Sequence, residues 1–474
     1  MKQIKTDVAI IGAGTAGLSA FRAVKAAGRK AVLIEGGPYG TTCARVGCMP
    51  SKLLIAAADV AHSAGHAAPF GVHIDVPVRI DGVQVMDRVK RERDRFVGFV
   101  LESVDRIDPA ERVRGYARFV DDTTLRVDDH SEIHASAVVI ATGSSPVVPE
   151  AYRVLGDRVI VNDDVFDWMD LPRRVMVVGA GVIGLELGQA LSRLGVATRI
   201  INRSSGLGGL SDPEVKASAI AAFKAELDLH LDTKILEVSR HADEVEVTYQ
   251  TEGKPPETGR FDYLLVAAGR RPNIDLLDLR NTSAVLDEKG MPEYDAATLQ
   301  LGGAPIFIAG DVNGILPVLH EAADDGRIAG QNAAAFPQAL HGRRRAPMSV
   351  VFADPQLAQA GLRCRQLPQQ GVVFGEVDFS DQGRSRVMLK NYGKLRVYAR
   401  QDNGLLLGAE MAGPAMEHIA HLLAWSVQQN LTVHEMLRMP FYHPVVEEGL
   451  RTALRQAASQ VDPEHTPEAT VNSA

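Results

Sequence analysis

The chain has 474 residues, of which 46% are apolar, and its formal net charge is −8 at pH 7. At about 150 residues per domain this length predicts roughly three domains, and the apolar content suffices for a core in each. The acidic charge gives no electrostatic footprint for nucleic acid or for an anionic membrane, so we expect neither partner. Residues 1–11 contain no apolar run long enough for a signal peptide or a membrane span, which predicts a cytoplasmic protein.

The first predicted unit is a strand, a glycine turn and a helix. Apolar residues 8–11 lead directly into Gly-Ala-Gly-Thr-Ala-Gly at 12–17, and helical composition follows over 18–27. Such a turn brings a pyrophosphate close to the free N–H groups of a helix N-terminus. A second strand ends in Glu35, whose carboxylate is placed to accept hydrogen bonds from ribose hydroxyls. The residues of this predicted dinucleotide site are Gly12, Gly14, Gly17 and Glu35.

Two of the only three cysteines follow this unit. Cys43 and Cys48 are separated by four residues, and a helical turn from the first through the second would place both sulfurs close together. A disulfide there closes a loop too short to add much stability, which favours a chemical role. Lys52 lies four residues beyond Cys48, where its charge favours the thiolate, and Pro50 sets the local backbone. We therefore predict a redox-active disulfide.

Two other interpretations of the cysteine pair are open: buried free thiols that act as small apolar residues, or half of a zinc site. Zinc would need two further ligands at matching spacing, and Cys364 stands alone in a polar run. Two histidine pairs have helical spacing but no further ligands, so no metal site is predicted. These pairs are His62 with His66 and His418 with His421.

The strand, turn and helix unit occurs a second time. Residues 175–178 form a predicted strand, 179–184 the turn, 185–194 the helix and 198–201 the next strand. Two dinucleotide sites in one chain indicate two different dinucleotides, one for electron entry and one for electron storage. A turn that binds nothing is the alternative for either unit alone. The glycines of the second site are Gly179, Gly181 and Gly184.

Other segments indicate how these units are connected. Residues 110–137 alternate apolar and polar residues in short runs, which predicts an antiparallel ribbon. Apolar strands follow at 138–143 and 264–269, and a further one at 306–311 ends in an acid and indicates a return to the first nucleotide domain. A third domain begins near the arginine run 343–345, which we interpret as a solvated linker.

A candidate base lies near the end of the third domain, in Pro-Phe-Tyr-His-Pro-Val-Val-Glu-Glu at 440–448. A disulfide cycle needs a group that takes a proton from an incoming thiol near neutral pH, and histidine titrates in that range. A neighbouring carboxylate would fix the tautomer of His443 and stabilise its charged form. Considered alone, this histidine is better explained as a satisfied packing residue than as a base.

Together these residues resemble the pyridine nucleotide-disulfide oxidoreductases of the dihydrolipoamide dehydrogenase and glutathione reductase type, over almost the whole chain to about Arg455. The motifs that carry the resemblance are the first glycine turn with Glu35, Cys43 and Cys48 with Pro50, Ser51 and Lys52, Ala141-Thr142-Gly143, the second glycine turn with Glu186, Gly269-Arg270-Arg271-Pro272-Asn273, Ala309-Gly310-Asp311, and His443-Pro444 with Glu448.

The resemblance implies FAD in the first site and NAD(P)H in the second. It places Cys48 beside the flavin and gives Cys43 the exchange with substrate. Lys52 would approach the flavin and pair with Glu186, and Asp311 would bind the ribityl and phosphate region of FAD. Thr142, Gly143 and Gly269 are further candidate cofactor contacts.

The resemblance also implies a homodimer, because the family places His443 and Glu448 in the active site of the partner subunit. The expected fold is α/β, with two dinucleotide-binding (Rossmann-like) domains, the first discontinuous, and a C-terminal α+β dimerisation domain. The expected limits are 1–148 for the first part of the FAD-binding domain, 149–272 for the NAD(P)-binding domain, 273–345 for the return to the FAD-binding domain, 346–458 for the dimerisation domain and 459–474 for a disordered tail.

The substrate is predicted less directly than the chemistry. Mercuric and large thioredoxin reductases carry extra C-terminal cysteines, and the last cysteine here is Cys364. With no obvious glutathione-binding extension, dihydrolipoamide is the first choice. The alternatives are an NADPH-dependent reductase of another small disulfide, a quinone or a metal, and a flavoprotein subunit with a mainly structural role. Val445 and Met49 depart from the usual dehydrogenase pattern, which puts the exact substrate in doubt.

The signals for the nicotinamide cofactor conflict. The strand that usually ends in an acid for NAD runs here into Asn202 and Arg203, which favours a 2′-phosphate and hence NADPH. Gly184 and Gly188 match the form typical of NAD enzymes, and the second arginine of NADP enzymes is replaced by glycine at 208–209. Because a charge-assisted contact is worth about 1.5–3 kcal/mol, we favour NADPH slightly, with NADH also accepted.

Overall fold

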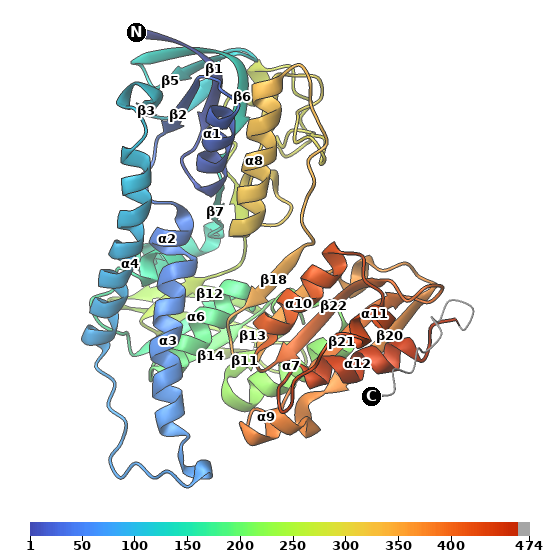
Figure 1. The fold of residues 1–474 in the computed structure, drawn as a ribbon. Helices are drawn as coiled ribbons and strands as arrows, with labels where there is room; N and C mark the ends of the chain where they lie inside the picture. Colours follow the sequence, from blue (N-terminus) through green and yellow to red (C-terminus); the bar gives the residue numbers. More distant parts are fainter. Residues whose placement is uncertain (463–474) are drawn as a thin grey trace.

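The first sheet has seven strands and joins segments that lie far apart in the chain (Figure 1). The protein is described here by a computed structural model that covers residues 1–462. The central strand β1 lies between β2 and β6, both parallel to it, and its residues 8–11 are buried. β4, β5 and β6 form the expected antiparallel ribbon. The order is β3 (Arg112–Arg114), β2 (Ala31–Glu35), β1 (Lys2–Ile11), β6 (Ser131–Ile140), β5 (Thr124–Val127) and β4 (Ala117–Phe119), with β17 (Ile306–Ile308) on β6.

Strand β17 brings the chain back to the first sheet after the second one has formed, because it pairs in parallel with β6. Helices α1 (Thr15–Ala26) and α8 (Leu319–Ala335) pack against each other over this sheet. A Cβ atom at Gly326 or Gly330 of α8 would collide with the backbone of α1. These two glycines therefore allow the close approach of the helices.

The second sheet carries the second glycine turn. Strand β9 lies at its centre, paired in parallel with β10 and β15, and a three-stranded antiparallel sheet adjoins it. The order is β11 (Asp228–His230), β10 (Ala197–Ile201), β9 (Arg174–Val178), β15 (Tyr263–Val266) and β8 (Val159–Ile160); the smaller sheet is β12 (Thr233–His241), β13 (Glu244–Thr251) and β14 (Glu257–Phe261). The helices here are α5 (Asn162–Val165), α6 (Val182–Arg193) and α7 (Pro213–Glu226), and the strands β7 (Ser144–Pro146) and β16 (Arg270–Pro272) pair where the chain leaves and re-enters the first domain.

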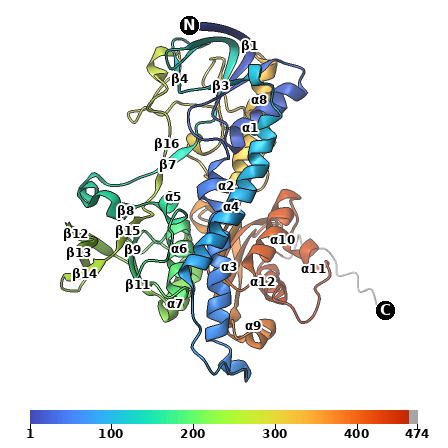
Figure 2. The same ribbon diagram turned by 90° about the vertical axis from the view of Figure 1, so that its left-hand side faces the viewer.

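Two long helices, α3 (Cys48–Gly65) and α4 (Gly82–Asp105), run alongside the second domain, and the short α2 (Thr42–Val46) precedes α3 (Figures 1 and 2). α3 packs against α4 and against α6. The expected helical turn from Cys43 through Cys48 is not continuous, which corrects that prediction. Gly47 has φ −126° and ψ −117°, outside the helical region, so a corner separates α2 from α3. Cys48 therefore becomes the first residue of an 18-residue helix.

The C-terminal domain is a five-stranded antiparallel sheet covered by helices, in agreement with the expected α+β class. α10 packs on β19 and β22, while α12 packs on β20 and β21. The order is β18 (Met348–Val351), β19 (Gln356–Gly361), β22 (Leu406–Gly413), β21 (Lys394–Arg400) and β20 (Val372–Asp378), and the helices are α9 (Gly383–Val387), α10 (Met416–Gln428), α11 (Val433–Leu437) and α12 (Glu448–Ala458).

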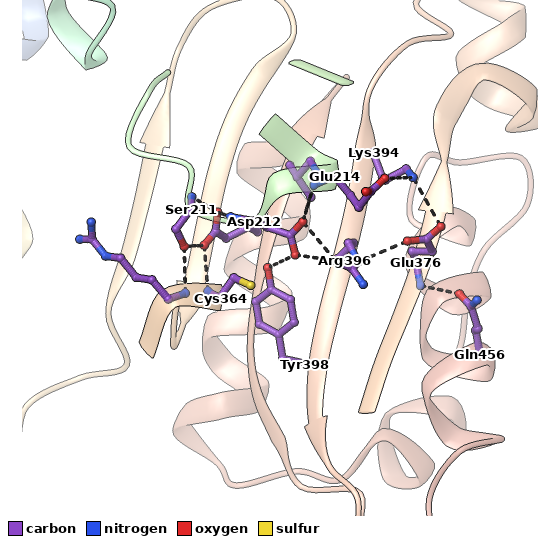
Figure 3. Close-up of polar contacts among 12 residues, drawn as sticks. Ser211, Asp212, Glu214, Cys364, Glu376, Lys394, Arg396, Tyr398 and Gln456 are labelled. Atoms are coloured by element: carbon purple, nitrogen blue, oxygen red, sulfur yellow. Dashed lines mark hydrogen bonds and ion pairs between the residues drawn. The ribbon is translucent and has the colours of Figure 1, made fainter. Parts of the chain in front are cut away.

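A buried polar network fastens the second domain to this sheet (Figure 3). The fully buried carboxylate of Asp212 caps α7 and also accepts hydrogen bonds at 3.0 Å from Arg396 and from the hydroxyl of Tyr398. Figure 3 shows both side chains pointing at it from the sheet. Glu410, equally buried, accepts from the backbone N–H groups of Ser211 and Asp212 at 2.6 and 2.9 Å. The start of α7 is thus tied to β21 and β22.

The arginine run at 343–345 is a loop in which Arg343 and Arg345 are exposed, as expected for a solvated linker, but it also pairs with acids of α8. Arg344 pairs with the carboxylate of Asp325 at 2.8 Å, and Arg345 pairs with Asp324 at 3.4 Å. Both acids lie on α8 and are buried. The acidic face of α8 therefore holds the linker in place, because a buried carboxylate needs a nearby cation.

The expected disordered tail, 459–474, falls mainly on residues 463–474, which lie outside the described part of the chain. Its first four residues are ordered: Val461 is buried in the C-terminal core, and Gln460 donates a hydrogen bond to the carbonyl of Phe374 at 2.6 Å. Apolar burial of Val461 is the physical reason for this order. The domain limits stated above stay a prediction.

Candidate active site

The two cysteines meet at the corner between α2 and α3. Both are free thiols, and their side chains form a hydrogen bond. This bond is the main cause that lowers the pKa of Cys48 from its ordinary value of 9.0 to about 7, and the charge of Lys52 lowers it further against burial and Glu186. The same bond, followed by burial, raises the pKa of Cys43 far above its usual range. These two pKa shifts favour a thiol at Cys43 that donates to a thiolate at Cys48.

Lys52 is held next to this pair. Its ammonium lies 2.7 Å from a carboxylate oxygen of Glu186, which α6 supplies from the second domain. The other oxygen of Glu186 accepts from the backbone N–H of Phe352 at 2.9 Å, and the ring centre of Phe352 lies 4.6 Å from the Lys52 nitrogen. The pairing of Lys52 with Glu186 that the resemblance implies is present. Sequence reasoning missed Phe352, whose only signal was a short apolar run in another domain.

The first glycine turn has the geometry of a phosphate cradle. Gly12 has φ +107°, and a Cβ there would collide with the carbonyl of Ala141. At Gly14, by contrast, no described atom lies within 4 Å of where a Cβ would be. The carboxylate of Glu35 accepts from the backbone N–H of Ala13 at 2.7 Å. The turn, its acid and the N-terminus of α1 therefore fit a dinucleotide such as FAD.

The second glycine turn repeats this geometry with one difference. Gly179 has φ +116°, and the position of a Cβ at Gly181 has no described atom within 4 Å. Here the N–H of Ala180 donates to the amide oxygen of Asn202 at 3.2 Å. Asn202 thus makes the contact that Glu35 makes in the first turn, without the negative charge. Arg203 follows it with an exposed side chain.

The remaining candidate cofactor residues meet where β7 and β16 pair. The hydroxyl of Thr142 donates to the carbonyl of Asn273 at 2.6 Å, and the carbonyl of Gly269 accepts from the N–H of Val147 at 3.0 Å. The Asp311 carboxylate accepts from the hydroxyl of Ser144 at 3.0 Å, directly after Gly143. These residues therefore lie together at the junction of the two nucleotide domains, and a direct contact to a cofactor stays a prediction for each.

His443 and Glu448 form a pair of their own. The imidazole Nδ1 lies 3.0 Å and 3.1 Å from the two carboxylate oxygens, and the histidine side chain is 79% exposed. This hydrogen bond is the main cause that lowers the pKa of Glu448 below its ordinary value. Glu448 begins α12, which lies well apart from α2 in both views (Figures 1 and 2). The exposed imidazole therefore does not face the cysteine corner of its own chain, and its role as a base stays a prediction.

Two family descriptions match most of the chain. Residues 6–326 match the pyridine nucleotide-disulphide oxidoreductases, and residues 347–454 match the dimerisation domain of the same group. The chain belongs to the pyridine nucleotide-disulphide oxidoreductase family. The predicted family and enzyme class are thereby confirmed, namely an FAD-dependent disulfide oxidoreductase that uses NAD(P)H.

Relatives of this oxidoreductase include dihydrolipoyl dehydrogenases. The enzyme of Haloferax volcanii is 30% identical over 468 residues, which is 96% of this chain and 97% of the relative. That of Geobacillus stearothermophilus is 29% identical over 460 residues, which is 94% of each chain.

Solved structures confirm the fold of the oxidoreductase. The HOCl-induced flavoprotein disulfide reductase RclA of Escherichia coli matches with a TM-score of 0.79 at 24% identity, over 95% of this chain and 99% of that one. LpdA of Mycobacterium tuberculosis matches with a TM-score of 0.81 at 22% identity, over 96% and 99% of the two chains. Within residues 1–462, no helix is both long and apolar enough to cross a bilayer. In the same range, no group of three or more His, Cys, Asp or Glu side chains is arranged to hold a metal ion.

Proposed function

We propose that this oxidoreductase is a dihydrolipoyl dehydrogenase that works as a cytoplasmic homodimer. The observation that carries the proposal is the cysteine corner, where Cys43 stays a thiol while Cys48 is biased to the thiolate. A division of this kind suits a substrate-exchanging sulfur and an electron-donating sulfur. The full-length similarity to curated dihydrolipoyl dehydrogenases supports a lipoyl dithiol as the substrate.

The proposed reaction begins with the cysteines as a disulfide. His443 of the partner subunit takes a proton from the first substrate thiol, and the resulting thiolate attacks the sulfur of Cys43. The Cys43–Cys48 bond breaks, and its electron pair stays on Cys48 as a thiolate. The second substrate thiol then attacks the substrate sulfur that is bonded to Cys43, and its proton passes to the departing Cys43 sulfur. The oxidised lipoyl ring closes, Cys43 leaves as a thiol, and the partner's His443 keeps the first proton until it is lost to solvent.

The chain's residues hold the products of this exchange. The two electrons remain on the cysteine pair, with Cys43 as a thiol and Cys48 as a thiolate. Lys52 stabilises the Cys48 thiolate. When bound at the first glycine turn and Glu35, FAD would supply the two-electron chemistry that connects the cysteine pair with NAD(P)⁺. Glu448 keeps the imidazole of His443 oriented and stabilises its charged form.

For the second cofactor we propose NADP(H), with NAD(H) also accepted. The polar contact to Ala180 comes from Asn202 rather than an acid, and the exposed Arg203 can receive a 2′-phosphate. Two glycines that favour NAD over NADP, Gly188 and Gly208, can be explained by packing and by backbone conformation. A Cβ at Gly188 would press on the side chain of Ile200, and Gly208 has φ +55°. Their identity therefore says little about the cofactor.

An acceptor panel on the purified, FAD-loaded protein tests the proposal. Dihydrolipoamide oxidation would be measured with NAD⁺ and NADP⁺, and the reduction of lipoamide, glutathione disulfide, cystine, a quinone and Cu(II) with NADH and NADPH. The lipoyl pair should give the highest kcat/KM. A higher value for any other acceptor contradicts the proposed substrate while leaving the oxidoreductase class intact.

A further inference from the structure

Helix α6 carries one polar stripe on an otherwise apolar surface. Glu186, Gln189 and Arg193 follow one another at intervals of three and four residues, which places them on the same helix face. The first two are almost fully buried, and the Arg193 side chain is only 5% exposed. Buried polar groups require hydrogen-bond partners, so the residues that this stripe contacts show what the helix holds in place.

All three side chains reach one short segment of the C-terminal domain, residues 352–354. Gln189 and Arg193 also bond Glu226 of α7, and Arg193 pairs with Asp59 of α3. Gln189 binds the backbone of Asp354 twice, accepting from its N–H and donating to its carbonyl, both at 2.7 Å. Arg193 donates to the Asp354 carboxylate at 3.2 Å. Glu186 accepts from the N–H of Phe352 at 2.9 Å. The helix that begins at the second glycine turn is thereby fastened to the segment that follows β18.

Phe352 is the residue of this segment that reaches the cysteine corner. Its N–H holds one oxygen of Glu186, while its ring lies 4.6 Å from the ammonium of Lys52, within the range of a cation–π contact. The Lys52 ammonium is therefore confined between a carboxylate and an aromatic face. Glu186 belongs to the second domain, whereas Phe352 comes from the domain that the family match assigns to dimerisation, yet its N–H and its ring act within the same subunit.

We propose that Phe352 is a positioning residue for the dithiol chemistry, which fixes the place of the Lys52 charge beside Cys48, and that Gln189 holds Phe352 in turn. The inference rests on the proposed role of the cysteine pair. The ionisable groups that face Cys48 are Cys43, Lys52 and Glu186, and the two charges act in opposite directions. A neutral ring can alter the titration of Cys48 only through them. Without the ring, only Glu186 holds the Lys52 ammonium, which can then shift toward that carboxylate and away from Cys48, so the thiolate loses part of its stabilisation.

The test measures the thiolate directly in the FAD-loaded enzyme. Cys43→Ser serves as background, because serine keeps a donor next to Cys48 and leaves no partner for a disulfide. The long-wavelength absorbance of the thiolate beside oxidised flavin is recorded against pH. Phe352→Leu should raise the apparent pKa of Cys48 by about half to one pH unit, and Phe352→Tyr should restore it.

The chain offers a matched control. Phe374 is also partly buried and its ring lies 4.7 Å from the guanidinium of Arg396, far from the cysteines, so Phe374→Leu should leave the titration unchanged. Gln189→Met should shift the titration of Cys48 in the same direction as Phe352→Leu. If the leucine variant fails to bind FAD, this second variant still tests the connection between residues 352–354 and Lys52. Equal titration curves for the Phe352 and Phe374 variants, or no recovery with tyrosine, overturn the inference. If the unmodified protein does not turn over lipoamide, only the proposed substrate is contradicted. The inference about Phe352 still stands or falls with the titration, which needs no substrate.

Discussion

Neighbouring groups stabilise the negatively charged thiolate form of Cys48. Cys43 donates a hydrogen bond to it, Lys52 contributes a positive charge, and the residue stands at the N-terminus of the long helix α3. Burial and the carboxylate of Glu186 act in the opposite direction. The stabilising contributions dominate, so the thiolate is present at neutral pH.

The first prediction concerns the two sulfurs. In the two-electron-reduced enzyme, the long-wavelength band should grow as pH rises through about 7, because Cys48 loses its proton there. Cys48→Ser should abolish the band, and Cys43→Ser should keep it while ending disulfide turnover. Absorbance spectra against pH for the three proteins check this. A band that survives in Cys48→Ser would show that the roles are exchanged.

The second prediction concerns the pair of exposed His443 and Glu448, the first residue of α12. His443→Gln should lower turnover by about 10² to 10⁴, the typical contribution of a positioned acid–base group. The reduction of FAD by NAD(P)H should stay fast, since the histidine acts only on the substrate thiols. Steady-state and stopped-flow rates separate the two half-reactions. Slow FAD reduction in this variant would argue against a role restricted to thiol chemistry.

Between the elements, contacts with the C-terminal sheet hold the second nucleotide domain. The polar stripe of α6 meets residues 352–354, and the start of α7 is held by Asp212 and Glu410. The loop 202–210, which follows β10, lies between these two anchors in the sequence. Its end also contacts β19, where the amide of Gln359 donates to the carbonyl of Gly209 at 2.9 Å. The loop that begins with Asn202 and Arg203 is therefore held in a fixed position at its other end.

The third prediction tests the α7 anchor. Asp212→Ala should lower the free energy of unfolding by about 3–5 kcal/mol, because it leaves the guanidinium of Arg396 and the hydroxyl of Tyr398 without a buried partner and removes a helix cap. Urea unfolding checks this. As control, Glu150→Ala removes an ion pair with Arg153 that is largely exposed and should change stability by less than about 1 kcal/mol. Equal effects of the two variants would contradict the anchor.

The fourth prediction concerns the cofactor loop. The natural protein should have a higher kcat/KM for NADPH than for NADH. Asn202→Glu combined with Arg203→Met should shift the ratio toward NADH by about tenfold to a hundredfold, since a charge-assisted contact to phosphate is lost and a carboxylate is gained. Arg203→Met alone separates the two contributions. A native preference for NADH that the double change leaves untouched would sink the assignment.

On the scale of the whole molecule, local patterns were readable from the sequence and distant contacts were not. The strands at 8–11 and 175–178 and both glycine turns lie where the apolar runs and turn residues predicted them. The break at Gly47 depends on how two helices meet, and a periodicity argument cannot detect it. The contact between Phe352 and Lys52 joins residues 300 positions apart and exists only once three domains have packed. The ion pairs of the arginine linker could not be predicted because their acidic partners lie on α8.

The central claim is that two subunits make one site, with the cysteine pair from one and the base from the other. Mixed dimers test it most directly. One subunit carries Cys43→Ser and the other carries His443→Gln, so each homodimer is inactive. If the site is shared, the purified heterodimer contains one intact site and should recover about half of the wild-type rate of dihydrolipoamide oxidation per dimer. No recovery above the two inactive homodimers would contradict the shared site.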